Sequence, residues 1–356
     1  MASEKEIVYS TALGLLYCNQ PRRVRGLIDA SGDVETAWNT AEGNDKDAIL
    51  TRAQNELAFV RKHGIRTYYY REEAYPKRLR ECANAPVMLF GKGNIEPNEG
   101  KFVSIVGTRG ASDRGKELTR RLVLDLAQRI PNLTIVSGLA FGIDIAAHRA
   151  ALEAGIPTII IPAHGLDRIY PAQHRSVAVA ALEKGGILTE YPSGTEPERL
   201  NFVMRNRIIA GLADAVVVTE SKQKGGSLIT ARVAVDYRRN VYTVPGRPTD
   251  VLSQGCNGLL RSGKARLIEN AEDLIRDLGW QPRQGIVQTE LEGLFAELSL
   301  EERNVLQILR ANEDGLHVNA IVTQTGKAYS DVATTLMMLE MNGFVHALAG
   351  DIYRAV

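Results

Sequence analysis

The sequence predicts an α/β protein built on a doubly wound, mostly parallel sheet, with a small helical region before the sheet and a winged-helix region after it. Between residues 101 and 244, short apolar runs alternate with helical segments. Continuous apolar strands separated by helices are typical of a parallel sheet that is covered on both faces. After residue 300, three helical segments precede two strand-like runs, and this order predicts the winged helix.

The stretch from Lys101 to Leu126 contains the opening unit of the sheet. Its apolar run, Phe102–Val106, is too short for a helix and is expected to be a buried strand. The turn Gly107-Thr108-Arg109-Gly110 follows, and Asp113 is expected to cap the next helix. A glycine turn between a strand and a helix presents backbone N–H groups and a helix N-terminus. We therefore expect an anion site here, and specifically a phosphate site.

The remaining elements follow from the same patterns, and three domains are expected: residues 1–66 (small helices), 67–282 (the sheet) and 290–356 (the winged helix). The other strands are expected at Thr67–Tyr70, Leu133–Val136, Thr158–Ile161, Gly186–Thr189, Ala215–Val218 and Val241–Val244. Helices are expected at Gly142–Ala154, Asn206–Leu212, Ser227–Val235, Glu301–Arg310, His317–Gln324 and Ser330–Asn342, with a linker at Gln281–Gly285 and a hairpin joining Phe344–Leu348 to Asp351–Arg354.

Charge is unevenly distributed along the 356 residues. Residues 1–100 are neutral, residues 101–280 carry a net charge of +6, and residues 290–356 carry 4 basic and 10 acidic side chains, a net charge of −6. This asymmetry indicates that the middle of the chain meets a polyanion and that the C-terminal region does not. No apolar run reaches the length of a membrane span, and the three cysteines are widely spaced. We expect a reduced, cytoplasmic protein without a membrane segment or a zinc site.

Several cofactor sites are disfavoured by the motifs present. A dinucleotide site needs G-x-G-x-x-G and an acidic residue after the second strand, but that strand ends at Ser137. Two stretches approach a P-loop, yet Glu117 and Ala265 stand where a magnesium-binding Ser or Thr is needed. Asp144 and His148 share a helix face, but no further metal ligands are placed near them, so capping or packing is the favoured role. We expect no cofactor and no metal.

Three glycine-containing loops are expected to converge at the carboxyl edge of the sheet, where open α/β sheets bind ligands. A row of phosphate sites fits a nucleic-acid strand better than a single nucleotide. Arginine forks suit phosphate oxygens, as do backbone and hydroxyl donors in a glycine loop. The candidate residues are Gly107, Thr108, Arg109, Gly138, Phe141, Gly142, Arg205, Asn206, Arg207, Lys224, Gly225, Gly226 and Ser227.

These motifs together resemble the DprA/Smf family, the DNA-processing proteins of bacterial transformation. The similarity runs from Tyr75 to Leu278 and rests on the ordered segments YP, PVMLFGKG, VGTRGAS, SGLAFGIDIAAHRAAL, GLDRIYP, EYPSG, FVMRNRIIAGLADAVVVTES, KGGSLITARVA, VPGRP and GCNGLLRSGKA. The terminal regions are similar too, though far less specifically, to the family's small SAM- or helix-hairpin-helix-like domain and its winged helix.

The resemblance implies an extended Rossmann-like sheet without a catalytic cofactor. It also implies a homodimer that binds single-stranded DNA, protects it and loads the recombinase RecA onto it. Arg109 would contact the DNA backbone, and the other candidate residues would line or complete the pocket. The sequence departs from the family pattern at His174, where Asn is frequent, and in the acidity of its winged helix, which suits a protein-binding or regulatory role.

Two alternatives remain open on the sequence alone. Related folds include nucleotide phosphoribohydrolases, whose PGGxGT-type loop is followed by a catalytic Glu. Gly225–Thr230 echoes that loop, but Ala231, Arg232 and Val233 follow it. The second alternative is a winged-helix transcription regulator, which the net charge of −6 disfavours because it would repel duplex phosphates.

Overall fold

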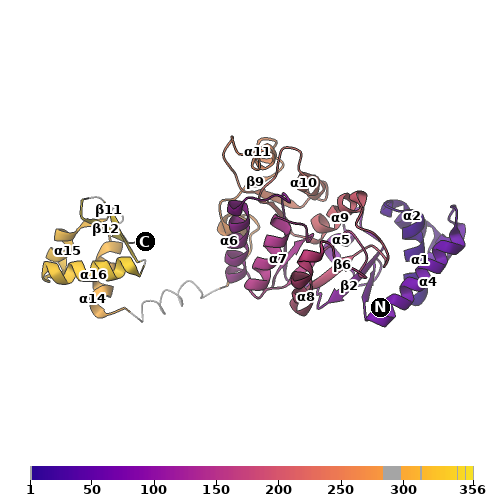
Figure 1. Ribbon diagram of the computed structural model, residues 1–356, viewed down its shortest axis with the longest axis horizontal. Helices are drawn as coiled ribbons and strands as arrows, with labels where there is room; N and C mark the ends of the chain where they lie inside the picture. The colour runs from indigo at the N-terminus through magenta and orange to yellow at the C-terminus, as the bar shows by residue number, and fades with distance from the viewer. Residues whose placement is uncertain (1, 284–297, 313–314, 343, 349, 356) are drawn as a thin grey trace. The chain divides into compact units, whose positions relative to one another are not determined.

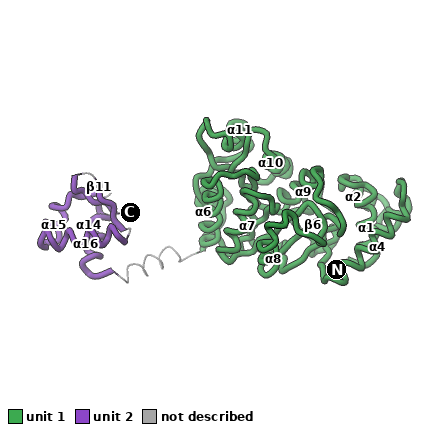
Figure 2. The backbone as a smooth tube through the Cα atoms, in the orientation of Figure 1, with its two compact units in different colours: residues 1–283 green, residues 284–356 purple. Residues whose placement is uncertain are grey.

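The computed structural model describes residues 2–283, 298–312, 315–342, 344–348 and 350–355. The chain divides into two compact units, residues 1–283 and residues 284–356 (Figure 2). The predicted linker and the predicted start of the winged-helix domain fall partly or wholly outside the described residues, since residues 284–297 are not described.

The first unit is built on a nine-stranded sheet with the order β1-β2-β6-β5-β4-β3-β7-β8-β9. The strands β2 and β6 pair antiparallel, as do β1 and β2, whereas all other neighbours pair in parallel. The predicted doubly wound, mostly parallel sheet is therefore confirmed. The strands are β1 (Arg66–Tyr69), β2 (Met88–Gly93), β3 (Lys101–Val106), β4 (Leu133–Ser137), β5 (Thr158–Ile160), β6 (Gly186–Thr189), β7 (Ala215–Val218), β8 (Asn240–Thr243) and β9 (Arg266–Leu267).

Helices cover the sheet on both faces (Figure 1). They are α5 (Lys77–Arg80), α6 (Asp113–Arg129), α7 (Ile143–Glu153), η1 (Ala172–His174), α8 (Arg175–Lys184), α9 (Arg199–Leu212), α10 (Ser227–Asp236), α11 (Gln254–Arg261) and α12 (Ala271–Asp277). The helix α9 begins seven residues before the predicted Asn206 start and so includes residues 199–205.

The period of two along a strand sends alternate side chains to opposite faces, and strand β3 shows the result. Val103 and Ile105 pack in one core cluster with residues of α6 and α7. Phe102 and Val106 belong to the other large cluster, with residues of α9 and α10. Ser104, fully buried between them, donates its hydroxyl to the Ile209 carbonyl of α9 at 2.7 Å. The strand that precedes the glycine turn, β3, is thus packed against helices on both of its faces.

Four helices precede the sheet, as the sequence predicts: α1 (Glu4–Leu16), α2 (Pro21–Ser31), α3 (Val34–Thr40) and α4 (Lys46–His63). Their apolar residues belong to the same core cluster as one face of the sheet. Polar contacts reinforce the junction: the Tyr70 hydroxyl donates to Asp29 at 2.6 Å, and the Ser193 backbone N–H donates to Glu56 at 2.8 Å. These helices and the sheet therefore form one compact unit.

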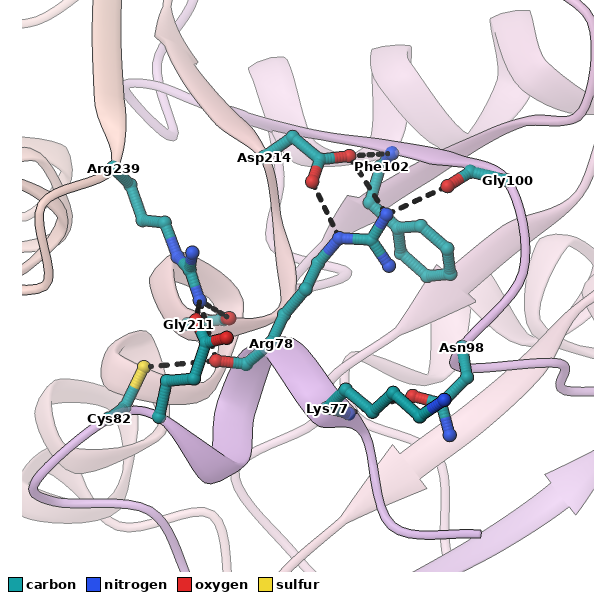
Figure 3. Close-up of polar contacts among 10 residues, drawn as sticks. Lys77, Arg78, Cys82, Asn98, Gly100, Phe102, Gly211, Asp214 and Arg239 are labelled. Atoms are coloured by element: carbon teal, nitrogen blue, oxygen red, sulfur yellow. Dashed lines mark hydrogen bonds and ion pairs between the residues drawn. The ribbon is translucent and has the colours of Figure 1, made fainter. Parts of the chain in front are cut away.

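An ion pair fastens the segment after β1 to the end of the sheet where β3 and β7 begin (Figure 3). Arg78 Nε lies 2.6 Å from Asp214 Oδ1, and Asp214 Oδ2 accepts the Phe102 backbone N–H at 2.8 Å. The Arg78 guanidinium also donates to the Gly100 carbonyl at 2.7 Å and lies 4.5 Å from the centroid of the Phe102 ring. Because these contacts lie at the amino ends of the strands, they are structural and leave the carboxyl edge open.

The second unit has the predicted winged-helix order. Its described elements are α14 (Leu300–Arg310), β10 (Leu316–His317), α15 (Val318–Thr325), α16 (Tyr329–Met341), β11 (Val345–Leu348) and β12 (Ile352–Ala355). The predicted hairpin is confirmed by the antiparallel pairing of β11 with β12, and β10, which the sequence analysis missed, adds a third strand. Ser299 and Glu302 form a reciprocal capping box at the start of α14. Within the parts of the chain that the structure describes, no helix has the length and apolar character needed to cross a membrane.

Candidate nucleic-acid interface

The loop after β3 places Arg109 at the carboxyl edge of the sheet. The Thr108 backbone N–H donates to the Glu220 carbonyl at 2.8 Å, which joins this loop to the loop after β7. Gly107 is needed because a Cβ there would lie 2.4 Å from Ile143 Cγ1 and 3.0 Å from the Glu220 carbonyl oxygen. Arg109 itself is exposed. The backbone at the start of the turn is therefore tightly packed, whereas the side chain of Arg109 is exposed to solvent.

The start of α6 differs from the expectation in two ways. Its cap is Ser112, whose Oγ accepts the Gly115 N–H at 3.0 Å, and not Asp113. The carboxylate of Glu220 accepts from the Ser112 backbone N–H at 2.9 Å and from its hydroxyl at 2.5 Å. The prediction that an external anion binds at this helix N-terminus is therefore wrong, because the carboxylate of Glu220 already lies there. Asp113 is exposed instead, and it pairs with Lys116 at 2.9 Å.

The loop after β4 approaches the first loop through its glycines. Gly142 has φ of 77° and lies so close to the first loop that a Cβ would be 2.2 Å from the Thr108 carbonyl oxygen. A glycine at this position therefore lets the two loop backbones approach closely. At Gly138 the close neighbour is a side chain: a Cβ would lie 1.6 Å from Arg205 Nη1. Phe141, between the two glycines, has 47% of its surface exposed and contacts the His174 ring edge-on at 4.7 Å between centroids.

The loop after β7 contributes two exposed lysines, Lys222 and Lys224. Neither forms an ion pair with a described residue. Gly226 is open, since a Cβ there would meet nothing within 4 Å. Ser227 is buried, and its hydroxyl donates to Ser221 Oγ at 2.9 Å. The cations of this loop therefore face solvent, whereas its predicted serine donor is turned inward.

Arg205 is brought to the interface but lies beneath it. Only 3% of the residue is exposed, and Nη1 donates to the Ile161 carbonyl at 2.6 Å. Burial lowers the pKa of its guanidinium, with Asp144 opposing the shift. Burial likewise raises the pKa of the Asp144 carboxyl, and Arg205 is the main group that opposes this. Arg205 thus supports the loop after β4 and the chain after β5 from within the protein, next to the buried Asp144 carboxyl group.

Arg207 lies on another side of α9, and the structure does not bring it to this interface. The residue is 5% exposed, and Nη2 pairs with Glu190 Oε2 at 2.5 Å. Burial lowers its pKa, but the attraction of Glu190 outweighs this and the pKa is raised. Arg205 and Arg207, both predicted to contact phosphate, therefore do not face one ligand together. Asn206, between them, is half-buried.

The sequence analysis missed an aromatic component of the interface. The guanidinium of Arg109 lies 4.9 Å from the ring centroid of Phe202, and that of Arg205 lies 5.9 Å from the same centroid. The Tyr170 ring, 48% exposed, is 6.0 Å from Phe202. Exposed aromatic rings beside cations are typical of surfaces that stack nucleic-acid bases. Phe202 could have been noticed in the sequence, because it lies three residues before Arg205. The sequence alone, however, did not show that its ring lies beside Arg109 and Tyr170.

The predicted packing role of Asp144 and His148 agrees with the structure. His148 is fully buried with Nδ1 2.7 Å from Thr158 Oγ1, and burial lowers its pKa to about 3. Asp144 accepts the Ala140 N–H at 3.3 Å. Among the described residues, no cluster of three or more His, Cys, Asp or Glu side chains is suited to hold a metal.

Neither P-loop-like stretch forms a phosphate loop. Gly258 lies inside α11, so its backbone N–H is part of the helix and does not belong to an open loop around a phosphate. The stretch from Gly110 to Lys116 ends in the first turn of α6, where the Glu220 carboxylate lies 2.3 Å from the position of a Cβ on Gly115. A phosphate would meet that carboxylate, so the structure agrees with the interpretation that both matches are accidental.

Three neighbouring strand ends of a Rossmann-like sheet thus carry glycine turns, exposed cations and aromatic rings, and they define an α/β protein with an extended cationic edge. A family model described as DNA recombination-mediator protein A matches residues 66–279, and one described as the DprA winged helix domain matches residues 293–351. The chain belongs to the DNA recombination-mediator protein A family, so the family resemblance found in the sequence is confirmed.

Curated relatives and solved structures agree with this assignment. Protein Smf of Synechocystis sp. is 36% identical over 311 residues, covering 79% of this chain and 77% of that protein. The DNA processing protein DprA of Streptococcus pneumoniae is 39% identical over 206 residues, covering 58% and 72%. Its X-ray structure matches with a TM-score of 0.66 at 32% identity, covering 77% of this chain and 98% of that one. A structure of Helicobacter pylori DprA that concerns its single-stranded DNA binding mode matches with a TM-score of 0.54 at 32% identity, covering 60% of this chain and 95% of that one.

Proposed function

We propose that this protein binds single-stranded DNA along the edge formed by the loops after β3, β4 and β7, and that it does so without catalysing a reaction. The observation that carries the proposal is the placement of Arg109 over the ring of Phe202, with the exposed Lys222 and Lys224 on the neighbouring loop. Cations would bind successive phosphates while aromatic rings receive unpaired bases. The single-stranded DNA binding mode of the Helicobacter pylori relative supports the same ligand.

The predicted contact set is revised on this basis. Gly107, Thr108, Arg109, Gly138, Phe141, Gly142, Asn206, Lys224, Gly225 and Gly226 remain proposed residues of the DNA site, and Phe202 and Tyr170 join them. Arg205 is proposed to support the site from within. Arg207 and the Ser227 hydroxyl are engaged inside the protein, so we propose no DNA contact for either.

A recombination mediator further needs a recombinase, and we propose that RecA is loaded onto the bound strand by a homodimer of this chain. Family membership supports this proposal. We also propose that the protein acts in the cytoplasm, where incoming single strands and RecA meet. The three cysteines, Cys18, Cys82 and Cys256, are all free thiols, as expected in a reducing compartment.

A gel shift that compares single-stranded, duplex and mononucleotide ligands tests the proposal. We expect preferential binding to the single strand and a steep loss of affinity with salt, because each neutralised phosphate releases counterions. Three phosphate contacts correspond to a slope of about −2 in log K against log salt for a single strand. Equal affinity for duplex, or no dependence on salt, would contradict the proposal.

The phosphoribohydrolase alternative is tested separately. Gly225-Gly226-Ser227 is followed along α10 by Ala231 and Arg232, where that enzyme class has a catalytic Glu. We therefore expect no free base when the protein is incubated with nucleoside monophosphates. Release of base at catalytic rates would replace the proposed function with an enzymatic one.

A further inference from the structure

The turn that carries Arg109 is anchored at both of its ends by one residue, Glu220. Near the start of the turn, the Thr108 backbone N–H donates to the Glu220 carbonyl oxygen at 2.8 Å. At its end, the Glu220 carboxylate accepts from the Ser112 backbone N–H at 2.9 Å and from the Ser112 hydroxyl at 2.5 Å. Among the described residues, the backbone N–H groups of Arg109–Ala111 have no hydrogen-bond partner. The backbone hydrogen bonds that fix this segment therefore lie at its two ends.

Glu220 is itself held firmly, because it lies just after strand β7, which runs between β3 and β8 in the sheet. Only 9% of the residue is exposed. The Thr219 backbone N–H donates to the Val106 carbonyl at 3.2 Å, which extends the pairing of β7 with β3 beyond the strand end. The Thr219 hydroxyl accepts a hydrogen bond from the Thr119 hydroxyl of α6 at 3.1 Å. The position of Glu220 is thus fixed relative to both β3 and α6, the elements that precede and follow the turn.

The carboxylate of Glu220 also supplies the negative charge that the start of α6 favours. The first N–H groups of a helix lack partners within it and, together with the helix dipole, attract an anion. Ser112 Oγ accepts the Gly115 N–H at 3.0 Å while its hydroxyl donates to Glu220. A Cβ on Gly115 would lie 2.3 Å from Glu220 Cδ, so the glycine leaves room for the carboxylate. Hydrogen bonds to a charged acceptor are roughly twice as strong as neutral ones, so this contact can hold the turn before any ligand is present.

We propose that Glu220 is a positioning residue of the DNA site, which holds the Arg109 turn in its binding arrangement in the unbound protein. This role rests on the proposed function, since it requires Arg109 to contact phosphate. A group that is already ordered loses less conformational freedom when it binds, so Glu220 strengthens binding without touching DNA. Its own charge acts in the opposite direction, because a carboxylate near the edge repels phosphates. A loss of affinity on its removal therefore comes from positioning and not from charge.

A double-mutant cycle on the full-length protein tests this role, with oligo-dT affinity measured by fluorescence anisotropy at several salt concentrations. Arg109→Ala should weaken binding about tenfold in the wild-type background but less than about threefold in the Glu220→Ala background, because the arginine is no longer held in place there. Glu220→Ala alone should flatten the salt dependence towards that of Arg109→Ala, a change that a loss of stability does not itself cause. An equal effect of Arg109→Ala in both backgrounds overturns the proposal.

Glu56→Ala is the matched control. Glu56 is 3% exposed and accepts from the Ser193 backbone N–H at 2.8 Å and from the Ser193 hydroxyl, so this variant loses the same pair of contacts. Glu56 lies on α4 and Ser193 follows β6, so neither belongs to the loops after β3, β4 and β7. In the Glu56→Ala background, Arg109→Ala should keep its full effect on affinity. If the effect shrinks there as well, lowered stability explains the result and the positioning role is rejected.

Hydrogen exchange on the wild-type protein without DNA tests the same role without any variant, so it does not depend on whether Glu220→Ala folds. The Thr108 and Ser112 amides donate to Glu220, and they should exchange at least about tenfold more slowly than the Gly110 amide. Equal rates would show that the turn is not held before DNA arrives and would overturn the proposal. If the wild type binds no oligo-dT, the proposed function fails, whereas the exchange rates still decide whether Glu220 holds the turn.

Discussion

The guanidinium carbon of Arg109 lies 4.9 Å from the ring centroid of Phe202, so the turn after β3 meets the helix α9 at the carboxyl edge of the sheet. Arg205 approaches the same ring at 5.9 Å from within the protein. The aromatic ring is thus contacted by an exposed and a buried cation. A cation–π contact at an exposed site contributes about 0.5–1 kcal/mol, enough to bias the orientation of the Arg109 side chain before a ligand arrives.

Replacing Arg109 with alanine should weaken binding to oligo-dT by about 1–3 kcal/mol, because a charge-assisted contact to phosphate is lost. The salt dependence should also flatten by about 0.7 in log–log slope for the one phosphate released. Fluorescence anisotropy at several salt concentrations measures both effects. The matched control is Arg121→Ala, which removes the same charge from an exposed position of α6. If both variants bind alike, Arg109 makes no specific contact.

Replacing Phe202 with leucine should weaken binding by about 1–3 kcal/mol, the range found when a stacking ring is removed. Leucine keeps an apolar side chain against Arg109 and Arg205, so the loss reports on stacking more than on folding. An abasic oligonucleotide of equal length serves as the control ligand. It should bind the variant and the wild type equally, since it offers phosphates but no bases. A similar loss for both ligands would place the phenylalanine in the support of Arg109 and not in base stacking.

The order of strands, turns and helices could be predicted because it depends on local patterns, and Gly107 and Gly142 mark the turns. Arg205 and Arg207 were both predicted to bind phosphate, but they cannot bind one phosphate together, because residues two apart on a helix do not face the same side. One guanidinium therefore contacts Ile161 and the other Glu190. The position of Glu220 at the start of α6 could not be predicted, because it joins residues 108 apart in the sequence.

Arg207→Ala should lower the free energy of unfolding by about 3–5 kcal/mol, because it leaves the partly buried Glu190 without its cation. Chemical denaturation measures this loss. Arg121→Ala, with an exposed side chain, should stay within about 0.5 kcal/mol of the wild type. In the folded fraction, Arg207→Ala should bind single strands more tightly than Arg109→Ala does. If Arg207→Ala bound single strands more weakly than Arg109→Ala, Arg207 would have to contact the DNA after all.

His148 should make stability depend on pH. Burial lowers its pKa to about 3 from an ordinary 6.5, with Arg205 and His174 adding to the shift. The unfolded chain therefore binds a proton below pH 6.5 that the folded protein does not bind. Stability is full above pH 6.5 and falls towards pH 3, by up to about 1.4 kcal/mol per pH unit from this one group.

The raised pKa of Asp144 acts in the opposite direction, because the folded protein holds that proton more tightly than the unfolded chain does. Comparing the wild type with His148→Asn isolates the histidine, since asparagine keeps a polar group near Thr158 and does not titrate. Urea denaturation at pH 7 and pH 5 should show a larger loss of stability in the wild type than in the variant. Equal losses would mean that His148 takes up a proton in the folded state.

Removal of residues 290–356 should leave single-strand affinity within about threefold of the full-length value. The removed segment carries a net charge of −6, so it adds no counterion release on binding a polyanion. The described residues of the remaining unit hold Arg109, Phe202 and Lys224 together with their own hydrophobic core. Anisotropy on oligo-dT at fixed salt gives the comparison, and duplex of the same length shows whether the winged helix adds affinity there. A loss of tenfold or more on the single strand would mean that the acidic unit takes part in binding, which its charge alone does not explain.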